Sequence, residues 1–152
     1  MKIKDLKTAV NFAIEQEQNA ADIYNSLLER SSNSGNRKLF EELRNTEYDH
    51  KKKLQELDLD NVESFNEDDN IPNIKATDYL VEPDRNGDLD YEDILVLAAK
   101  REQKSYEMYK KFSEIFKDND KLKQLFEILA NEEKSHKYEI EKMYDDIVLN
   151  EN

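Results

Sequence analysis

Four segments of the sequence carry apolar side chains at alternating steps of three and four residues. This spacing places the side chains on one face of an amphipathic helix. It predicts helices over about residues 3–31, 36–58, 90–117 and 119–148. The apolar positions that define the four faces are Leu6, Val10, Ala13 and Leu27; Phe40, Leu43 and Leu54; Leu95, Ala98 and Phe112; and Leu122, Phe126, Leu129 and Ile140.

The connections between the predicted helices differ greatly in length. Residues 31–36 (SSNSGN) and 117–120 (KDND) are short breaks, so each flanking pair of helices forms an antiparallel hairpin. Residues 59–89 contain both prolines and no helical pattern of useful length, which indicates a long crossover. We therefore predict one all-α domain over residues 1–152. It is a ferritin-like four-helix bundle of two helical hairpins joined by that crossover, with the third helix parallel to the second.

Composition supports long helices and narrows the classes of function. The chain has 152 residues, only two glycines and two prolines, and 39% charged residues, so the turns that a sandwich or barrel requires are missing. The net charge of −13 argues against nucleic-acid binding. The absence of cysteine excludes disulfides, thiolate catalysis and cysteine-ligated metals on this chain. The first twenty residues predict neither a signal peptide nor a membrane span, so we expect a cytoplasmic protein.

The two predicted hairpins repeat each other in their polar residues. Each apolar face is interrupted near its middle by a glutamate, and the two glutamates of a hairpin lie 30 positions apart in the first hairpin and 31 in the second. The only two histidines of the chain each follow one of these glutamates by three positions. The residues in question are Glu17, Glu47 and His50 in the first hairpin, and Glu102, Glu133 and His136 in the second.

Four carboxylates facing one core require a compensating positive charge. An unpartnered buried carboxylate costs several kcal/mol, and no lysine or arginine occupies the four faces. Four glutamates and two Glu-x-x-His histidines are the ligand set of di-iron and di-manganese carboxylate proteins. Two divalent ions would neutralise the four charges. The sequence therefore predicts a dinuclear metal site whose ligands are Glu17, Glu47, His50, Glu102, Glu133 and His136, with two iron ions, or manganese or a mixture, as the cofactor.

Two tyrosines lie on the same faces as two of the glutamates. Tyr24 and Tyr109 follow Glu17 and Glu102 by seven residues, which is two helical turns. They are either core aromatics or second-shell donors that orient a metal-bound carboxylate on the facing helix. A different stretch, DRNGDLDYED at 84–93, has a calcium-loop composition but lacks the required glycine position and closing glutamate. We expect it to cap the third helix.

Several segments together resemble the rubrerythrin-like branch of the ferritin superfamily. They are AIEQEQNAADIY (13–24), NTEYDHKKKL (45–54), IKATDYLVEP (74–83), ILVLAAKREQKSYEMY (94–109) and LANEEKSHK (129–137). The resemblance implies a non-haem di-iron centre that reduces hydrogen peroxide, or dioxygen, to water. It implies Glu17 and Glu102 as terminal ligands, Glu47 and Glu133 as bridging ligands, and His50 and His136 as nitrogen ligands.

The sequence departs from that family in two respects. Full-length rubrerythrins carry a cysteine-ligated rubredoxin domain, so for this cysteine-free chain we expect electrons from an external donor protein. Ser105, and Ala20 as its counterpart in the first hairpin, stand where the family has an additional glutamate and its symmetry mate. This departure indicates a more symmetrical six-ligand site, like that of ferritins or bacterioferritins.

Two other functions remain compatible with these residues. One is ferritin-like iron oxidation, storage or delivery without peroxidase turnover, and the other is a bundle that keeps the ligands but serves as a binding or structural module. For the redox function we expect hydrogen peroxide or dioxygen as the substrate. No nucleic acid or membrane is expected as a partner, and the resemblance implies a homodimer.

Overall fold

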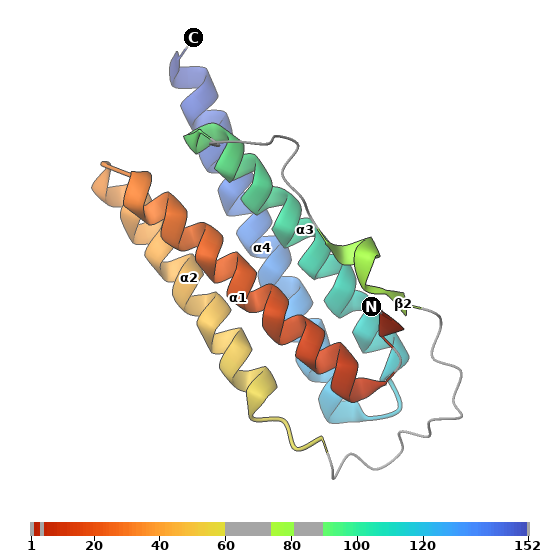
Figure 1. The fold of residues 1–152 in the computed structure, drawn as a ribbon. Coiled ribbons are helices and arrows are strands. Elements are labelled where there is room, and N and C mark those ends of the chain that lie inside the picture. Colours follow the sequence, from red (N-terminus) through yellow and green to blue (C-terminus); the bar gives the residue numbers. More distant parts are fainter. Residues whose placement is uncertain (1, 4, 60–73, 81–89, 152) are drawn as a thin grey trace.

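The computed structural model describes residues 2–3, 5–59, 74–80 and 90–151. Its four long helices form two hairpins, α1 (Leu6–Arg30) with α2 (Ser34–Gln55) and α3 (Tyr91–Ile115) with α4 (Asp120–Glu151). The two hairpins meet where α1 packs against α3. As Figure 1 shows, α2 and α3 run in the same direction along the bundle. The predicted all-α bundle of two hairpins is therefore confirmed, and so is its parallel third helix.

Reciprocal capping boxes stand at the start of two of the helices. Asp5 accepts a hydrogen bond from the backbone N–H of Thr8 at 2.7 Å, and the Thr8 hydroxyl accepts one from the N–H of Asp5 at 3.1 Å. Asp90 and Asp93 form the same reciprocal box at the start of α3. The expected capping of the third helix is thus confirmed at Asp90. Residues 84–89 of that acidic stretch lie outside the described residues.

Two short strands differ from the sequence prediction. β1 (Lys2–Ile3) pairs antiparallel with β2 (Ile74–Lys75), which leads into the 3₁₀ helix η1 (Ala76–Tyr79). The prediction of a helix from residue 3 is wrong, because the Asp5 cap starts α1 at Leu6 and leaves Ile3 in an extended backbone. Ile3 is buried in the core, and its strand ties the beginning of the chain to the crossover.

The ends of the other helices differ from the prediction by a few residues. α2 begins at Ser34 rather than at 36, because Asn33 accepts hydrogen bonds from the N–H groups of Gly35 at 2.9 Å and Asn36 at 3.1 Å. α2 ends at Gln55 and not at 58, whereas α4 continues to Glu151, beyond 148. The helical period identifies the interior of a helix but carries little information about its last turn.

The apolar core consists of two clusters with a polar layer between them. On α1 the residues before Glu17 pack in one cluster and those after Ala20 in the other, and the remaining helices follow the same division. Each large buried side chain contributes about 1.5–3 kcal/mol, and these contributions hold the acidic layer together from both sides. The first cluster includes Phe12, Tyr109, Phe112, Phe126 and Leu129, and the second includes Tyr24, Leu27, Phe40, Leu95 and Ile140.

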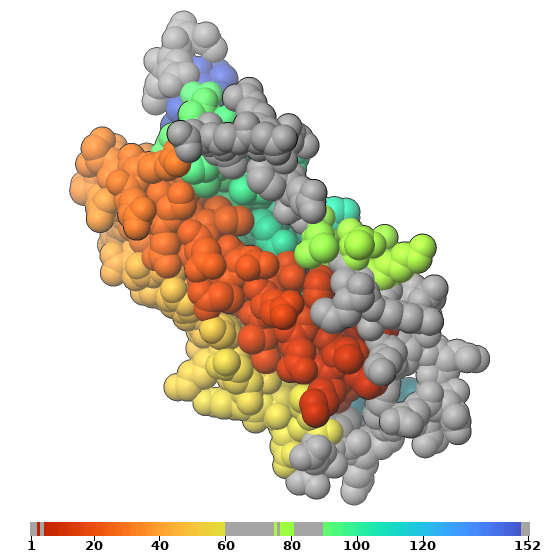
Figure 2. Space-filling view, viewed as in Figure 1, coloured from red at the N-terminus to blue at the C-terminus, as the bar shows by residue number. Residues whose placement is uncertain are grey.

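Helices α1 and α2 lie side by side on one face of the bundle. In the space-filling view, the side chains of α1 pack side by side with those of α2 along the bundle (Figure 2). Among the described residues, none of the helices is both long and apolar enough to span a membrane.

Candidate metal centre

The six side chains predicted to face the core all reach the polar layer and are buried. They form two overlapping groups of four residues, and within each group one potential ligand atom per residue lies within 4.8 Å of the others. Glu47 and Glu133 belong to both groups, so the arrangement suits two metal ions that share two carboxylates. The first group is Glu17, Glu47, His50 and Glu133, and the second is Glu47, Glu102, Glu133 and His136.

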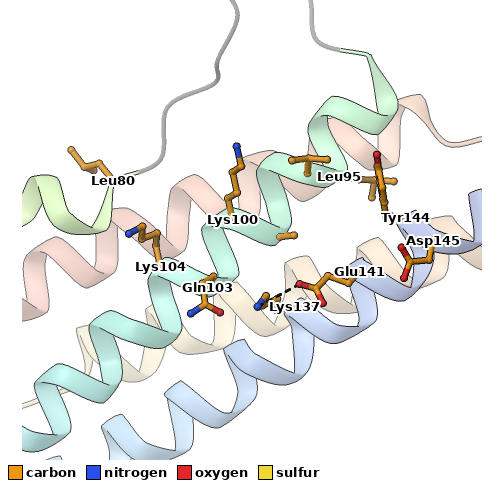
Figure 3. A pocket seen from close by; sticks show the side chains of 11 residues that line it. Leu80, Leu95, Lys100, Gln103, Lys104, Lys137, Glu141, Tyr144 and Asp145 are labelled. Carbon is orange, nitrogen blue, oxygen red and sulfur yellow. Dashed lines mark ion pairs between the residues drawn. The ribbon is translucent and has the colours of Figure 1, made fainter. Parts of the chain in front are cut away.

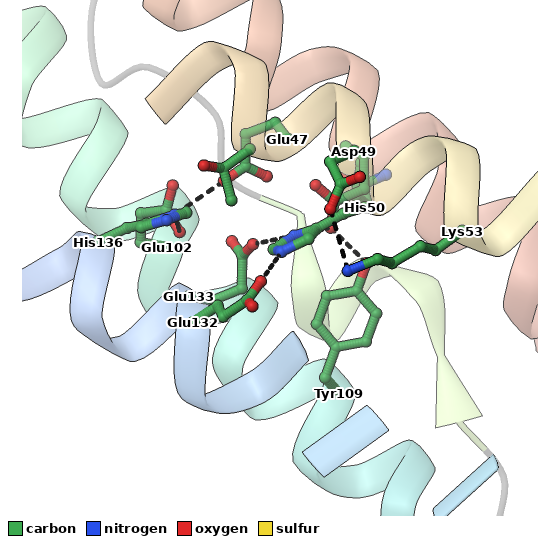
Figure 4. Close-up of polar contacts among 12 residues, drawn as sticks. Glu47, Asp49, His50, Lys53, Glu102, Tyr109, Glu132, Glu133 and His136 are labelled. Carbon is green, nitrogen blue, oxygen red and sulfur yellow. Dashed lines mark hydrogen bonds and ion pairs between the residues drawn. The ribbon is translucent and has the colours of Figure 1, made fainter. Parts of the chain in front are cut away.

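His50 on α2 contacts the layer through one ring nitrogen and a further carboxylate through the other. Its Nδ1 lies 2.8 Å from Oε1 of Glu133 and 3.4 Å from Oε1 of Glu17. Its Nε2 contacts Oε2 of Glu132, the residue that precedes Glu133 on α4 (Figure 4). A carboxylate that accepts a hydrogen bond from Nε2–H keeps the proton on that nitrogen, so the lone pair of Nδ1 is available for a metal ion.

His136 on α4 faces the other half of the layer through its Nδ1. Its Nδ1 lies 3.0 Å from Oε1 of Glu47 and 3.7 Å from Oε2 of Glu102. The rings of His50 and His136 are nearly parallel, with an angle of 12° and centroids 6.2 Å apart. The two hairpins, which repeat each other in sequence, are therefore related by an approximate two-fold axis that passes through the polar layer.

Several buried atoms of this layer have no hydrogen-bond partner among the described residues. Although Nδ1 of His50 is close to Oε1 of Glu133, the pair lacks hydrogen-bond geometry. Buried polar groups are nearly always hydrogen-bonded, so a cluster of unsatisfied carboxylate oxygens and an imidazole nitrogen fits a pair of metal ions. The atoms are Glu17 Oε2, Glu47 Oε2, His50 Nδ1, Glu102 Oε2, and Glu133 Oε1 and Oε2.

The electrostatics of the metal-free layer show the cost of the arrangement. Burial, followed by repulsion from the neighbouring glutamates, raises the pKa of Glu47 and of Glu133 well above the ordinary value. Burial acts to lower the pKa of His50, but its contacts with Glu133 and Glu17 outweigh that effect and raise it to about 11. Burial also acts to raise the pKa of Glu102, yet hydrogen bonds and the charge of His136 bring it below the ordinary value. Without metal, the layer therefore retains protons.

The two tyrosines on the ligand faces bond across the bundle. The Tyr24 hydroxyl donates to Oε1 of Glu102, and the Tyr109 hydroxyl donates to Oε1 of Glu17. In each case the phenol on one hairpin holds a carboxylate on the other, and its own ring is packed in an apolar cluster. Burial, and then the charge of the adjacent glutamate, raise the pKa of both phenols well above 10, so each hydroxyl keeps its proton.

The sequence analysis missed two charged residues beside the layer. Arg101 is only 4% exposed, and its guanidinium donates to the side-chain carbonyl of Gln16. Its pKa is lowered by burial, although the charges of the four layer glutamates oppose that effect. Glu132, the partner of His50, was also missed. Each of these two residues directly precedes a layer glutamate in the sequence, and adjacent residues on a helix point about 100° apart, so neither belonged to an apolar face.

A groove of about 590 Å³ on the outer side of α3 and α4 is separate from this layer. Figure 3 shows Leu95, Lys100 and Tyr144 around it, and Lys137 paired with Glu141 at 3.4 Å. None of the six layer residues lines the groove.

Residues 93–152, which comprise most of α3 and all of α4, match the family model described as Rubrerythrin. The match covers 60 of the 152 residues and shows that this part of the chain is similar to that family. A hypothetical protein from Pyrococcus furiosus has a similar structure, with a TM-score of 0.69 and 25% sequence identity over 93% of this chain and 89% of that chain. That likeness extends the ferritin-like fold over both hairpins. The rubrerythrin match covers only the second hairpin, and the first hairpin supplies the other half of the layer. No curated protein matches the chain.

Proposed function

We propose that this chain is a non-haem di-iron carboxylate protein that reduces hydrogen peroxide, or dioxygen, with electrons from an external donor protein. The observation that carries the proposal is the pair of overlapping buried groups that share Glu47 and Glu133. The rubrerythrin match over residues 93–152 supports the same reaction class. In this proposal Glu17 and Glu102 would be terminal ligands, Glu47 and Glu133 would be shared by the two ions, and the two histidines would provide nitrogen ligands.

The chemistry supplied by the metals is electron transfer. A pair of ferrous ions held by the six layer residues would supply the two electrons that, with two protons, convert hydrogen peroxide into two water molecules. Imidazole and carboxylate ligands suit iron and also manganese. The external donor returns two electrons to complete the cycle.

The residues of the chain hold and insulate this reaction centre. Tyr24 and Tyr109 fix the orientation of Glu102 and Glu17 through their hydroxyl protons. The apolar clusters on both sides of the layer exclude water, which strengthens the electrostatic interactions within it. Arg101 adds one fixed positive charge beside the four glutamates.

The test begins with metal-free protein under anaerobic conditions. Ferrous iron is titrated in, and hydrogen peroxide is then added while the visible spectrum is recorded. We expect two iron ions per chain and oxidation of both by one peroxide molecule. The Glu47→Ala variant is expected to lose the second iron and the peroxide reaction, whereas Glu41→Ala, an exposed position on the same helix, is expected to keep both. An unaffected Glu47→Ala protein would rule out Glu47 as a shared ligand.

One observation favours iron oxidation as a second candidate function. Ser105 is buried in the second hairpin and Ala20 in the first, so neither supplies the additional carboxylate that rubrerythrins carry. The six-residue layer is consequently close to two-fold symmetric. Size separates the two functions, because storage requires a hollow shell that accumulates many iron ions per chain. We propose a homodimer that binds no more than two iron ions per chain. Light scattering combined with iron analysis distinguishes such a dimer from a shell that stores iron.

A further inference from the structure

The two halves of the polar layer differ at one position just outside the histidines. Glu132 precedes Glu133, and the matching residue before Glu47 is Thr46. The ligand groups themselves repeat almost perfectly, so this difference breaks the two-fold symmetry of the layer on the side of the histidines. The two histidines consequently have different surroundings on the sides that face away from the layer.

His50 is closed on both sides. Its Nδ1 faces Glu133 and Glu17 in the layer, and its Nε2 contacts the carboxylate of Glu132. The His50 side chain is fully buried. A carboxylate bound to the ring nitrogen that faces away from the metal fixes the orientation of the ring, and such support typically strengthens metal binding by about 10–100-fold.

His136 is closed only on the side of the layer. Its Nδ1 faces Glu47 and Glu102, but its Nε2 has no hydrogen-bond partner among the described residues. Thr46 provides no support, because its hydroxyl donates to the backbone carbonyl of Glu42 at 2.9 Å. His136 is 8% exposed, whereas His50 is 0% exposed.

His136 lines a surface pocket between α2 and α4. The pocket has a volume of about 240 Å³, and its polar lining consists of Glu42, Thr46, Glu132, Ser135, His136 and Glu139. Three of these six side chains are carboxylates, and clefts lined by charges of one sign raise the local concentration of ions of the opposite sign. The pocket therefore combines attraction for cations with a metal-ligating side chain in its wall.

We propose that divalent metal ions reach the polar layer through this pocket, and that the ion bound beside His136 exchanges faster than the ion bound beside His50. Thr46 leaves the position beside His136 open, and Glu132 closes the position beside His50. The inference rests on the dinuclear centre of the proposed function and goes beyond it, because it makes the two metal positions unequal. Glu132 and Thr46 act here as positioning residues.

Cobalt(II) is the probe for the test, because its visible absorption reports ligation directly. Metal-free protein is loaded with two equivalents, excess EDTA is added, and the loss of absorption is followed by stopped flow. We expect two phases of equal amplitude whose rates differ by about tenfold or more. His136→Gln should remove the fast phase and His50→Gln the slow one.

Two reciprocal substitutions exchange the asymmetric position between the halves. Thr46→Glu is expected to slow the fast phase by about tenfold, and Glu132→Thr to accelerate the slow phase by a similar factor. Glu139→Gln, in the pocket wall, is expected to slow cobalt uptake and to weaken the salt dependence of uptake. The control is Glu127→Gln, an exposed glutamate elsewhere on α4, which should change neither rate. Wild type and Glu132→Thr still decide the question should Thr46→Glu fail to fold.

The failures of the two proposals are distinguishable. A protein that binds two metal ions per chain but releases both at one rate overturns the inference and leaves the dinuclear centre intact. Two phases that Thr46→Glu and Glu132→Thr leave unchanged also overturn it. A protein that takes up no cobalt and no ferrous iron overturns the proposed function and the inference together.

Discussion

Replacing Glu47 by glutamine tests the idea that the polar layer is unfavourable without metal and favourable with it. Glu47 is fully buried and belongs to both ligand groups. Glutamine keeps the size of the side chain and removes its charge, and its amide can donate to the carboxylates around it. We expect opposite effects in the two states: the metal-free protein becomes more stable, and the stabilisation by metal becomes smaller.

The size of both effects can be worked out from the layer. A carboxyl group with a reference pKa of about 4.3 must be protonated at pH 7 or buried as a charge. Protonation costs about 1.4 kcal/mol for each of about 2.7 pH units, so the penalty is at most about 4 kcal/mol. A gain of about 2–3 kcal/mol corresponds to about 4–12 °C in Tm for a chain of this length. Metal at a hundred times its Kd stabilises the protein by about 2.7 kcal/mol per site. The variant should lose at least half of the stabilisation that two bound metal ions give.

The assay is thermal unfolding at pH 7, followed by circular dichroism, with and without zinc(II). Glu41→Gln is the matched control, because it removes the same charge from an exposed position on α2. The control should shift both melting temperatures by less than about 2 °C. The reasoning would be refuted by a Glu47→Gln protein that melts at a lower temperature than wild type without metal, or that keeps the full response to zinc.

Three further predictions concern pH, charge and capping. The raised pKa values of Glu47, Glu133 and His50 mean that folding favours their protonated forms, so their contribution to stability is complete below the unfolded-state values and is lost as pH rises. The Tm of the metal-free protein should therefore fall between pH 5.5 and 8.5, while the shift produced by zinc grows; a metal-free Tm that rises over this range would contradict the assignment. Arg101→Met removes the buried cation beside four glutamates, so the free energy of unfolding of the metal-free protein should fall by about 1–3 kcal/mol. Calorimetry should show tighter zinc binding, because a positive charge next to the site has been removed. Weaker zinc binding would show that the arginine only supports packing. Asp90→Ala removes the cap of α3 and should cost about 1 kcal/mol in urea unfolding with no change in metal stoichiometry; an unchanged midpoint would show that the capping box contributes nothing.

The sequence alone determined the four helices and the identity of the side chains in the layer. A helical period fixes which residues share a face, and glutamates at positions that are otherwise apolar reveal themselves against that pattern. Two histidines in matched frames, His50 and His136, added the repeat. Such local information also predicted the crossover, because its length and composition exclude a tight turn.

Only the tertiary structure decided which groups meet across the bundle. Tyr24 bonds to Glu102 on the other hairpin, and His50 meets Glu132 on α4, because these contacts depend on how the helices are rotated and offset against one another. Arg101 and Glu132 lie beside the apolar faces, where a charged residue is indistinguishable in sequence from one in solvent. The strand pair of Lys2–Ile3 and Ile74–Lys75 is equally invisible, because two-residue strands have no period and form only when the fold brings distant segments together.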